Sequence, residues 1–172
     1  MGNNLRDWAI SRQLSTKRGL LISTAYKRGV CIMNPNTKGA LGEHGVIKYL
    51  LSKSLPVFKS ICDNSRIDLV TEVDGKLVKI QVKTTSSKDG KAWLYTKKSC
   101  LNRKYNYSYE EGDVDVFALY VDDIDRVFFI SSKEATKNTS SFTLRFTKPG
   151  NNQVKNINFA DDYLDFEKAL RD

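Results

Sequence analysis

Two segments of alternating apolar and polar residues, joined by a two-residue turn, limit the folds open to this chain more than any other feature. Residues 66–73 and residues 76–83 both alternate, and the pair Asp74 and Gly75 between them is typical of a tight β-hairpin turn. With these two residues as the loop, Val73 pairs with Lys76, and the register of the whole hairpin follows. The apolar residues of both strands then share one face, which consists of Ile67, Leu69, Thr71, Val73, Val78, Ile80 and Val82. Both strands agree on the side that faces the core, so the register is self-consistent.

The opposite face of the hairpin carries polar side chains at one end. In the expected register Asp68 lies directly across from Gln81, and Lys83 follows two residues later. Carboxylate and amide oxygens are ligands that Mg²⁺ prefers, and the backbone carbonyl of Val82 could complete the set. A bound metal activates water and offsets charge on a phosphate, while Lys83 could orient or deprotonate that water. The pattern favours phosphodiester hydrolysis, although ordinary exposed strand residues would give the same spacing.

A second carboxylate comes from a segment whose periodicity is helical. Residues 37–54 place Ile47, Leu50 and Leu51 on one stripe, and Glu43 projects from the same side. We expect a helix here, with Glu43 able to hold a metal from another direction. A solvated residue near the helix start is the alternative.

The other predicted elements are short and mixed in type. We expect an extended segment at 56–60, strands at 92–96, 115–121, 126–131 and 142–146, a capped short helix from 131, and a terminal helix at 160–170. This order indicates an α/β domain around a mixed sheet. Pro35 disfavours helix at the residue before it, so we place a boundary there, with an extension at 1–36 and a domain at 37–172.

Positive charge is concentrated in two stretches of the chain. The formal charge is +8, and the first forty residues alone contain seven basic side chains and one acid. The second stretch, residues 88–104, interleaves six basic residues with Trp93 and Tyr95. Such patterns suit contact with nucleic-acid phosphates, sugars and bases, and a solvated surface is the alternative. The candidate contacts are Arg6, Arg12, Lys17, Arg18, Lys27 and Arg28 in the extension, and Lys88, Lys91, Lys97, Lys98, Arg103 and Lys104 in the second stretch.

Several classes of protein are disfavoured. The chain of 172 residues suits one domain with an extension, and no apolar run is long enough to span a bilayer. The N-terminus has no apolar targeting segment, so we expect a cytoplasmic protein without a membrane partner. Three widely spaced cysteines and one histidine make a zinc site an improbable reading of the sequence.

The candidate site residues resemble a known family. Glu43, the segment around Asp68, and the run Gln81, Val82 and Lys83 are similar to the PD-(D/E)XK nuclease superfamily, in particular to the group I intron-associated homing endonucleases related to archaeal Holliday junction resolvases. The similarity extends over residues 38–165. It implies a restriction-endonuclease-like core with a central mixed β-sheet flanked by helices. Two positions depart from the family pattern: Ile67 replaces the motif proline, and Gln81 replaces the usual acid.

The resemblance also implies an activity and its partners. The expected enzyme hydrolyses double-stranded DNA at a specific site, uses Mg²⁺ with Mn²⁺ as a substitute, and needs no other small-molecule cofactor. Glu43, Asp68, Gln81 and Lys83 would be catalytic, with Glu43, Asp68, Gln81 and the Val82 carbonyl as metal ligands. A homodimer or homotetramer would bring two sites to opposite strands. A junction resolvase, or a non-catalytic DNA-binding protein with a decayed site, remains the alternative.

Overall fold

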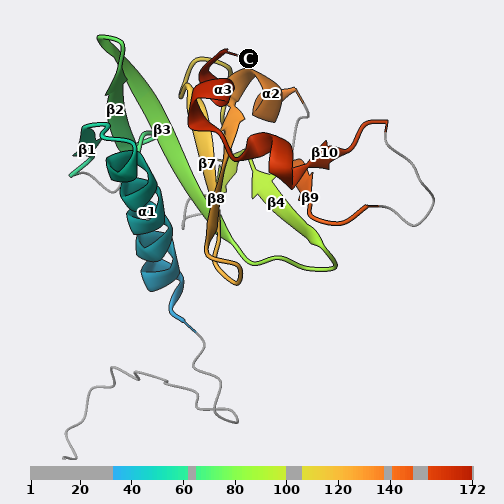
Figure 1. Cartoon of the computed structure of the whole chain (residues 1–172). Coiled ribbons are helices and arrows are strands. Elements are labelled where there is room, and N and C mark those ends of the chain that lie inside the picture. The colour runs from blue at the N-terminus through green and yellow to red at the C-terminus, as the bar shows by residue number, and fades with distance from the viewer. Residues whose placement is uncertain (1–32, 62–64, 100–105, 138–140, 149–154, 172) are drawn as a thin grey trace, which may run out of the picture. The chain divides into compact units, whose positions relative to one another are not determined.

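The computed structural model describes residues 33–61, 65–99, 106–137, 141–148 and 155–171 (Figure 1). The domain has three layers, with the long first helix and the last helix on one face of a five-stranded sheet, and a three-stranded sheet together with short helical segments on the other. The α/β fold with a central mixed sheet is as expected, whereas the second sheet was not foreseen. In the part of the chain that the structure describes, no helix is long and apolar enough to cross a membrane.

Helix α1 (Pro35–Ser52) begins two residues earlier than the sequence suggests. The side chain of Asn34 accepts a hydrogen bond from the backbone N–H of Asn36 at 2.9 Å and so caps the first turn. Pro35 occupies the start of the helix, where its missing N–H costs nothing and its fixed φ angle fits. The proline therefore opens the helix rather than separating two segments. Residues 1–32 of the predicted extension (1–36) lie outside the described residues, so the two-part division of the chain stays a prediction.

The five-stranded sheet has the order β1-β2-β3-β7-β8. Its strands are β1 (Val57–Lys59), β2 (Leu69–Val73), β3 (Lys76–Thr85), β7 (Val116–Val121) and β8 (Arg126–Ser131). The predicted hairpin is confirmed, since Val73 pairs with Lys76 and Leu69 with Ile80. Asp74 and Gly75 have φ angles of 51° and 75°, as a two-residue turn of this kind requires. Strand β3 runs parallel to its neighbour β7 and antiparallel to its neighbour β2, which makes the sheet mixed.

A second sheet, of order β10-β9-β4, covers part of the main sheet. It consists of β4 (Lys91–Tyr95), β9 (Ser141–Arg145) and β10 (Asn158–Phe159). A small ribbon, β5 (Lys97–Ser99) with β6 (Asn106–Ser108), follows β4 along the chain. Strands β5, β6 and β10 have three residues or fewer, too few for an alternating pattern to reveal them, and the sequence did not predict them.

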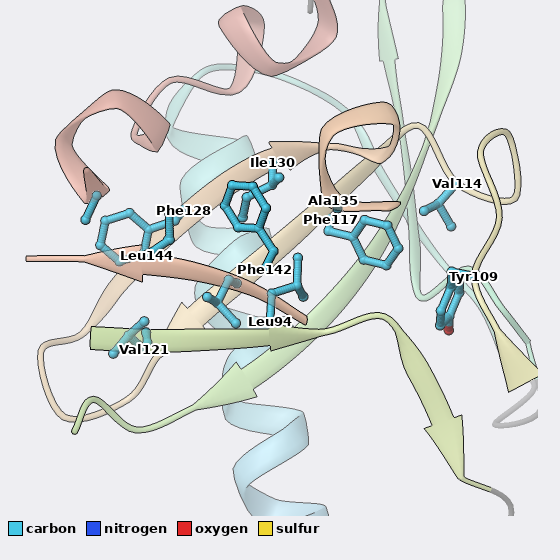
Figure 2. Close-up of a cluster of buried hydrophobic side chains, with 13 residues drawn as sticks. Leu94, Tyr109, Val114, Phe117, Val121, Phe128, Ile130, Ala135, Phe142 and Leu144 are labelled. Carbon is cyan, nitrogen blue, oxygen red and sulfur yellow. The ribbon is translucent and has the colours of Figure 1, made fainter. Parts of the chain in front are cut away.

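The core has two parts, one on each face of the main sheet. On the helical side Val46 and Leu50 of α1 pack with Ile80, Val82 and other residues of the sheet. Figure 2 shows the other part, in which side chains of β4 and β9 meet those of β7 and β8. Strand β7 is buried along its whole length because both of its faces are covered.

The C-terminal segment is not the continuous helix that its apolar spacing predicts. It consists of a short 3₁₀ helix, η1 (Ala160–Tyr163), and helix α3 (Phe166–Arg171). Asp165 lies between them, and its Oδ1 accepts hydrogen bonds from the backbone N–H groups of Glu167 at 2.9 Å and Lys168 at 3.4 Å. This cap starts a new helix and explains the interruption. Helix α2 (Ser132–Thr136) has the predicted cap, because Ser131 accepts from the Glu134 N–H.

Candidate active site

Asp68 and Gln81 meet where strand β2 begins beside β3. Oδ2 of Asp68 accepts a hydrogen bond from Gln81 Nε2 and another, at 2.8 Å, from the backbone N–H of Val82. Gln81 Nε2 also donates to the carbonyl oxygen of Val82 at 3.1 Å. The backbone continues the pairing, since the Asp68 N–H donates to the Ile80 carbonyl at 3.0 Å. The side chains that the hairpin register predicts to face each other are thus in direct contact.

Tyr109 contacts Gln81 from the part of the core that lies between the two sheets. Its hydroxyl donates to Gln81 Oε1 at 2.6 Å, and Gln81 and Tyr109 are only 5% and 4% exposed. The Tyr109 ring packs edge-on against Phe117, with ring centroids 5.2 Å apart. Both ends of the Gln81 amide are therefore bonded, which fixes its orientation in a place where an unbonded amide would be costly.

Lys83 stands beside the same tyrosine. Its Nζ lies 5.3 Å from the centre of the Tyr109 ring, a cation–π distance. Gln81 and Lys83 alternate with Val82, whose side chain belongs to the core under α1, so both project to the opposite side of the sheet. Asp68, Gln81 and Lys83 are brought together as the sequence predicts, and Tyr109 links the last two.

Glu43 occupies a different position from these residues. It lies on α1, and its Oε2 is 2.7 Å from Nζ of Lys59 on β1. Lys59 pairs with Leu69, on the face of the sheet that α1 covers, whereas Gln81 projects to the opposite face. The part of the chain that the structure describes contains no group of three or more His, Cys, Asp or Glu residues placed to hold a metal ion. The fourth residue of the expected site is thus on the other side of the sheet from its expected partners.

The atoms around Gln81 nevertheless fit a hard cation. The Asp68 carboxylate and the Val82 carbonyl oxygen both lie within hydrogen-bond reach of one point, which the Gln81 amide nitrogen occupies. Because this nitrogen donates a hydrogen bond to each of the two oxygens, both oxygens point toward the same place. Turning the amide about its last bond would put Oε1 there instead, giving the oxygen-only ligand set that Mg²⁺ prefers.

The predicted nucleic-acid contacts are only partly within the described structure. The six basic residues of the extension, together with Arg103 and Lys104, lie outside the described residues, as does the side chain of Lys98. Lys88 and Lys91 flank the turn before β4 and bond to each other through their backbones at 2.8 and 3.0 Å, and Lys97 is exposed at the start of β5.

A separate acidic cluster follows β7. Burial raises the pKa of Asp122, but hydrogen bonds from Lys38 and Ser86 more than offset this, so its pKa lies below its ordinary value. Hydrogen bonds from Ser87 lower the pKa of Asp123. A hydrogen bond to Asp125 and burial raise the pKa of Tyr120 to about 12. Each carboxylate is bonded within the fold, so the cluster ties α1 to the neighbouring loops and is not part of the site.

Comparison with known proteins decides the family. The sequence pattern described as PD-(D/E)XK endonuclease matches residues 33–166, most of the chain. The chain belongs to the PD-(D/E)XK endonuclease family. It is therefore a nuclease. The three residues that resemble the family motif, Asp68, Gln81 and Lys83, lie in the hairpin of β2 and β3.

The fold of this PD-(D/E)XK endonuclease is also found among solved structures. It is similar to a bacterial homing endonuclease, I-Ssp6803I, with a TM-score of 0.68 and 22% sequence identity, over 81% of this chain and 95% of that one. At this identity the likeness concerns the fold. No curated protein sequence matches the chain.

Two residues that contact the predicted site residues of this endonuclease were missed by sequence reasoning. The hydrogen bond from the Tyr109 hydroxyl to Gln81 has no local signal in the sequence. Lys59 pairs with Glu43 across two elements. Both contacts join segments far apart in the chain, and the spacing of residues along the sequence does not predict long-range contacts.

Proposed function

We propose that this endonuclease hydrolyses double-stranded DNA at a specific site in a Mg²⁺-dependent reaction, with Asp68, Gln81 and Lys83 as its catalytic group. The observation that carries the proposal is the bonded set of Asp68, Gln81 and the Val82 backbone beside Lys83, in a chain of the PD-(D/E)XK family. These are the acid, neutral oxygen donor and cation that the reaction needs at one place.

Asp68, Gln81 Oε1 and the Val82 carbonyl would hold the metal ion, and Mn²⁺ would serve in place of Mg²⁺. When bound, such an ion supplies a Lewis acid that stabilises negative charge on the phosphate and makes water a better nucleophile. Only one of these three groups carries a formal charge, so we expect weaker metal affinity than in a site with two carboxylates.

The Gln81 amide has two roles according to its orientation. With Nε2 toward Asp68, it holds the carboxylate in place through a hydrogen bond. With the amide turned, Oε1 faces Asp68 and Nε2 faces Tyr109. The Tyr109 hydroxyl can donate to Oε1 in the first orientation and accept from Nε2 in the second, because a phenol does both. Tyr109 is thus a positioning residue that supports either state.

Lys83 provides the positive charge of the site. Its ammonium group would contact the scissile phosphate or the attacking water and offset the negative charge that develops during hydrolysis. The adjacent Tyr109 ring keeps the lysine close to Gln81 while its three donors can still turn toward a substrate.

Glu43 is proposed as a second acid that reaches the site from α1. In the described structure its charge is balanced by Lys59 at 2.7 Å. Because α1 covers the other face of the sheet, Glu43 would have to leave Lys59 and pass around the edge of the sheet to act on the metal or on a water molecule, and a DNA phosphate that competes for Lys59 would release it for this movement. This sequence of events couples substrate binding to completion of the acidic site.

A homing endonuclease is favoured over a junction resolvase by the fold similarity to I-Ssp6803I, which is described as a bacterial homing endonuclease. We propose a homodimer or homotetramer, since two copies of the site would be needed to cut both strands in one complex. A long recognition site would follow from the combined contacts of the subunits.

Cleavage assays with matched variants test the proposal. Supercoiled DNA, linear duplex and four-way junction are incubated with Mg²⁺ or with EDTA, using the wild type, Asp68→Ala, Lys83→Ala and the control Lys76→Ala. Lys76 is exposed at the other end of the same strand. We expect Mg²⁺-dependent cutting of duplex DNA by the wild type and by the control only. Cutting by both site variants at the wild-type rate would refute the assignment, and preference for the junction would favour a resolvase.

A further inference from the structure

Among the residues that the structure describes, one face of the second sheet contributes to neither of the two core clusters. In β4 and β9 the pairs Ala92 with Leu144 and Leu94 with Phe142 belong to the core between the sheets. Figure 2 shows Leu94, Phe142 and Leu144 within this cluster. Strand residues alternate between faces, so the remaining pairs point outward. These outward residues are Lys91, Trp93 and Tyr95 of β4 and their partners Arg145, Thr143 and Ser141 of β9. We call these six residues the outer sheet face.

The charge on the outer sheet face is unusual for a stable protein. Lys91 lies directly opposite Arg145 in the antiparallel register. Like charges at directly opposed positions destabilise a sheet, and none of the six residues is acidic. The Arg145 Nε donates to the Thr147 carbonyl at 3.1 Å, which holds the guanidinium at this end of the strand rather than letting it swing away. A cation pair that folding alone would not favour indicates an anionic partner.

The composition of the face indicates what kind of anion. Trp93 and the 59%-exposed Tyr95 lie along the same strand as Lys91, and Ser141 and Thr143 add hydroxyl donors. Cations that bind phosphates, flanked by aromatic rings that contact sugars or bases, are the groups with which proteins hold nucleic acids. A lone inorganic anion would need the cations but not the aromatic row.

The outer sheet face also connects to the candidate active site. Tyr95 is followed by Thr96, whose carbonyl accepts a hydrogen bond from the Tyr109 backbone N–H at 2.9 Å. Tyr109 in turn bonds Gln81. At the other end, Lys88 lies across the turn from Lys91, with Asp89 as the local acid. The cations therefore lie at the start of β4, and the chain that leaves the end of β4 contacts the candidate site through Thr96 and Tyr109.

We propose that the outer sheet face binds the DNA duplex, with Lys91 and Arg145 contacting phosphates and Trp93 and Tyr95 contacting sugars or bases. The proposal rests on the proposed function in taking DNA as the substrate. It adds Arg145, Thr143 and Ser141 to the interface and assigns the binding to one defined surface of the fold.

Salt-dependent binding tests the phosphate contacts. The affinity of full-length protein for a labelled duplex is measured by fluorescence anisotropy at several salt concentrations, with Ca²⁺ in place of Mg²⁺. The variant Lys91→Gln/Arg145→Gln is compared with the control Lys48→Gln/Lys76→Gln, which removes the same charge from exposed positions outside the face. We expect the slope of log affinity against log salt to fall by about 1.8 in the face variant, since each phosphate contact contributes about 0.9. The control should change it far less.

Stability and fluorescence give independent readouts. Because the like charges repel, Lys91→Gln should raise the thermal stability of the free protein while it weakens DNA binding. In a Trp8→Phe background Trp93 is the sole tryptophan, and its emission should change when duplex is added. Equal salt slopes for the face and control variants would overturn the proposal, as would unchanged Trp93 emission at saturating DNA.

Two other outcomes distinguish DNA binding by the outer sheet face from an oligomer interface and from the proposed hydrolysis. If the face variant changes the oligomeric state in size-exclusion chromatography but leaves the salt slope intact, the face joins copies of the chain and the proposal fails. If the wild type binds duplex with the expected slope and Trp93 response but does not cleave it, the proposed hydrolysis fails while the outer sheet face stands.

Discussion

Gln81 is the residue on which the chemistry of the site depends. Its nitrogen bonds Asp68 and the Val82 carbonyl, and its oxygen receives the Tyr109 hydroxyl, so a neutral side chain is fully bonded in a buried place. A carboxylate there would stand against Asp68 without a cation between them. The amide thus makes the metal-free fold tolerable and, in the proposed site, would offer its oxygen to the metal once turned.

Replacing this amide by an acid should change metal affinity. We expect Gln81→Glu to bind Mn²⁺ roughly tenfold more tightly, about 1.4 kcal/mol, because the ligand set gains a charge. The metal-free protein should unfold at a lower temperature, since two carboxylates then repel. Isothermal titration calorimetry and thermal unfolding measure both effects. Leu77→Glu is the matched control, because it adds an acid at a position 66% exposed on the same strand. An unchanged affinity in Gln81→Glu would show that this side chain is not a ligand.

At the scale of elements, α1 must lie close against β3 to bring Glu43 near the sheet. Gly42 is buried, and a Cβ added there would overlap Thr84 Oγ1 and lie 3.2 Å from Thr84 Cβ. Only a glycine allows this approach without moving the helix or the strand. The close contact at residue 42 therefore sets the position of its neighbour, Glu43.

Substitutions at two glycines of α1 should have opposite effects. Gly42→Ala should destabilise the fold by about 1–3 kcal/mol, because the extra methyl overpacks the helix–sheet contact. Gly39→Ala should stabilise it by about 0.5–1 kcal/mol, since a Cβ there meets nothing within 4 Å and alanine favours helix. Chemical denaturation measures both, and Gly42→Ala/Thr84→Ala should recover part of the loss. Equal effects of the two single substitutions would contradict the packing argument.

The start of α1 is also held by a carboxylate whose effect depends on pH. Lys38 Nζ lies 2.9 Å from Asp122 Oδ2, and the Asp122 pKa is lowered below its ordinary 3.8. A lowered folded-state pKa contributes stability that is present above the unfolded value and lost as pH falls through the folded one. Asp122→Asn should therefore cost up to about 1 kcal/mol near pH 7 and nothing at pH well below 3.8. Unfolding free energies measured across this range check it, and a pH-independent difference would speak against the ion pair.

The extent to which elements could be predicted follows from their length and pattern. The hairpin of β2 and β3 was predictable in register because a two-residue turn and two alternating strands determine it locally. The parallel pairing of β3 with β7 was not, since it depends on segments joined by a long connection. Asp68, Gln81 and Lys83 were found because they lie on the local hairpin, whereas Tyr109 and Lys59 arrive through long-range packing. The break before α3 was hidden because the apolar spacing continues across it, and only the Asp165 cap reveals it.

At the scale of the whole molecule, the proposed active site and the proposed DNA-binding surface belong to different sheets. The proposed site on the main sheet has one carboxylate, Asp68, beside the cation Lys83, and the outer sheet face is proposed to supply the cations that attract an anionic duplex. The extension of residues 1–36 is a further basic segment, with six basic side chains and one acid.

Neutralising the extension should alter binding to all DNA sequences alike. We expect the variant with Lys17, Arg18, Lys27 and Arg28 changed to glutamine to bind duplex more weakly and with a smaller salt slope, by up to about 0.9 for each phosphate that the protein no longer neutralises. Substitution is preferable to deletion of residues 1–36, since α1 begins at Pro35 and its cap would be removed. An unchanged salt slope, measured with specific and nonspecific duplex, would assign the extension a role other than phosphate binding.

We propose that the carboxylate of Asp68 takes part in DNA hydrolysis and does not merely hold the hairpin together. The most direct measurement is the single-turnover rate of DNA cleavage in Mg²⁺ by Asp68→Asn, with duplex affinity in Ca²⁺ and unfolding free energy measured on the same sample. Asparagine keeps an oxygen for the Gln81 and Val82 donors but removes the charge. We expect a fall in rate of roughly 100-fold or more, with DNA still bound and the fold intact. Cleavage at the wild-type rate by this folded, DNA-bound variant would contradict it.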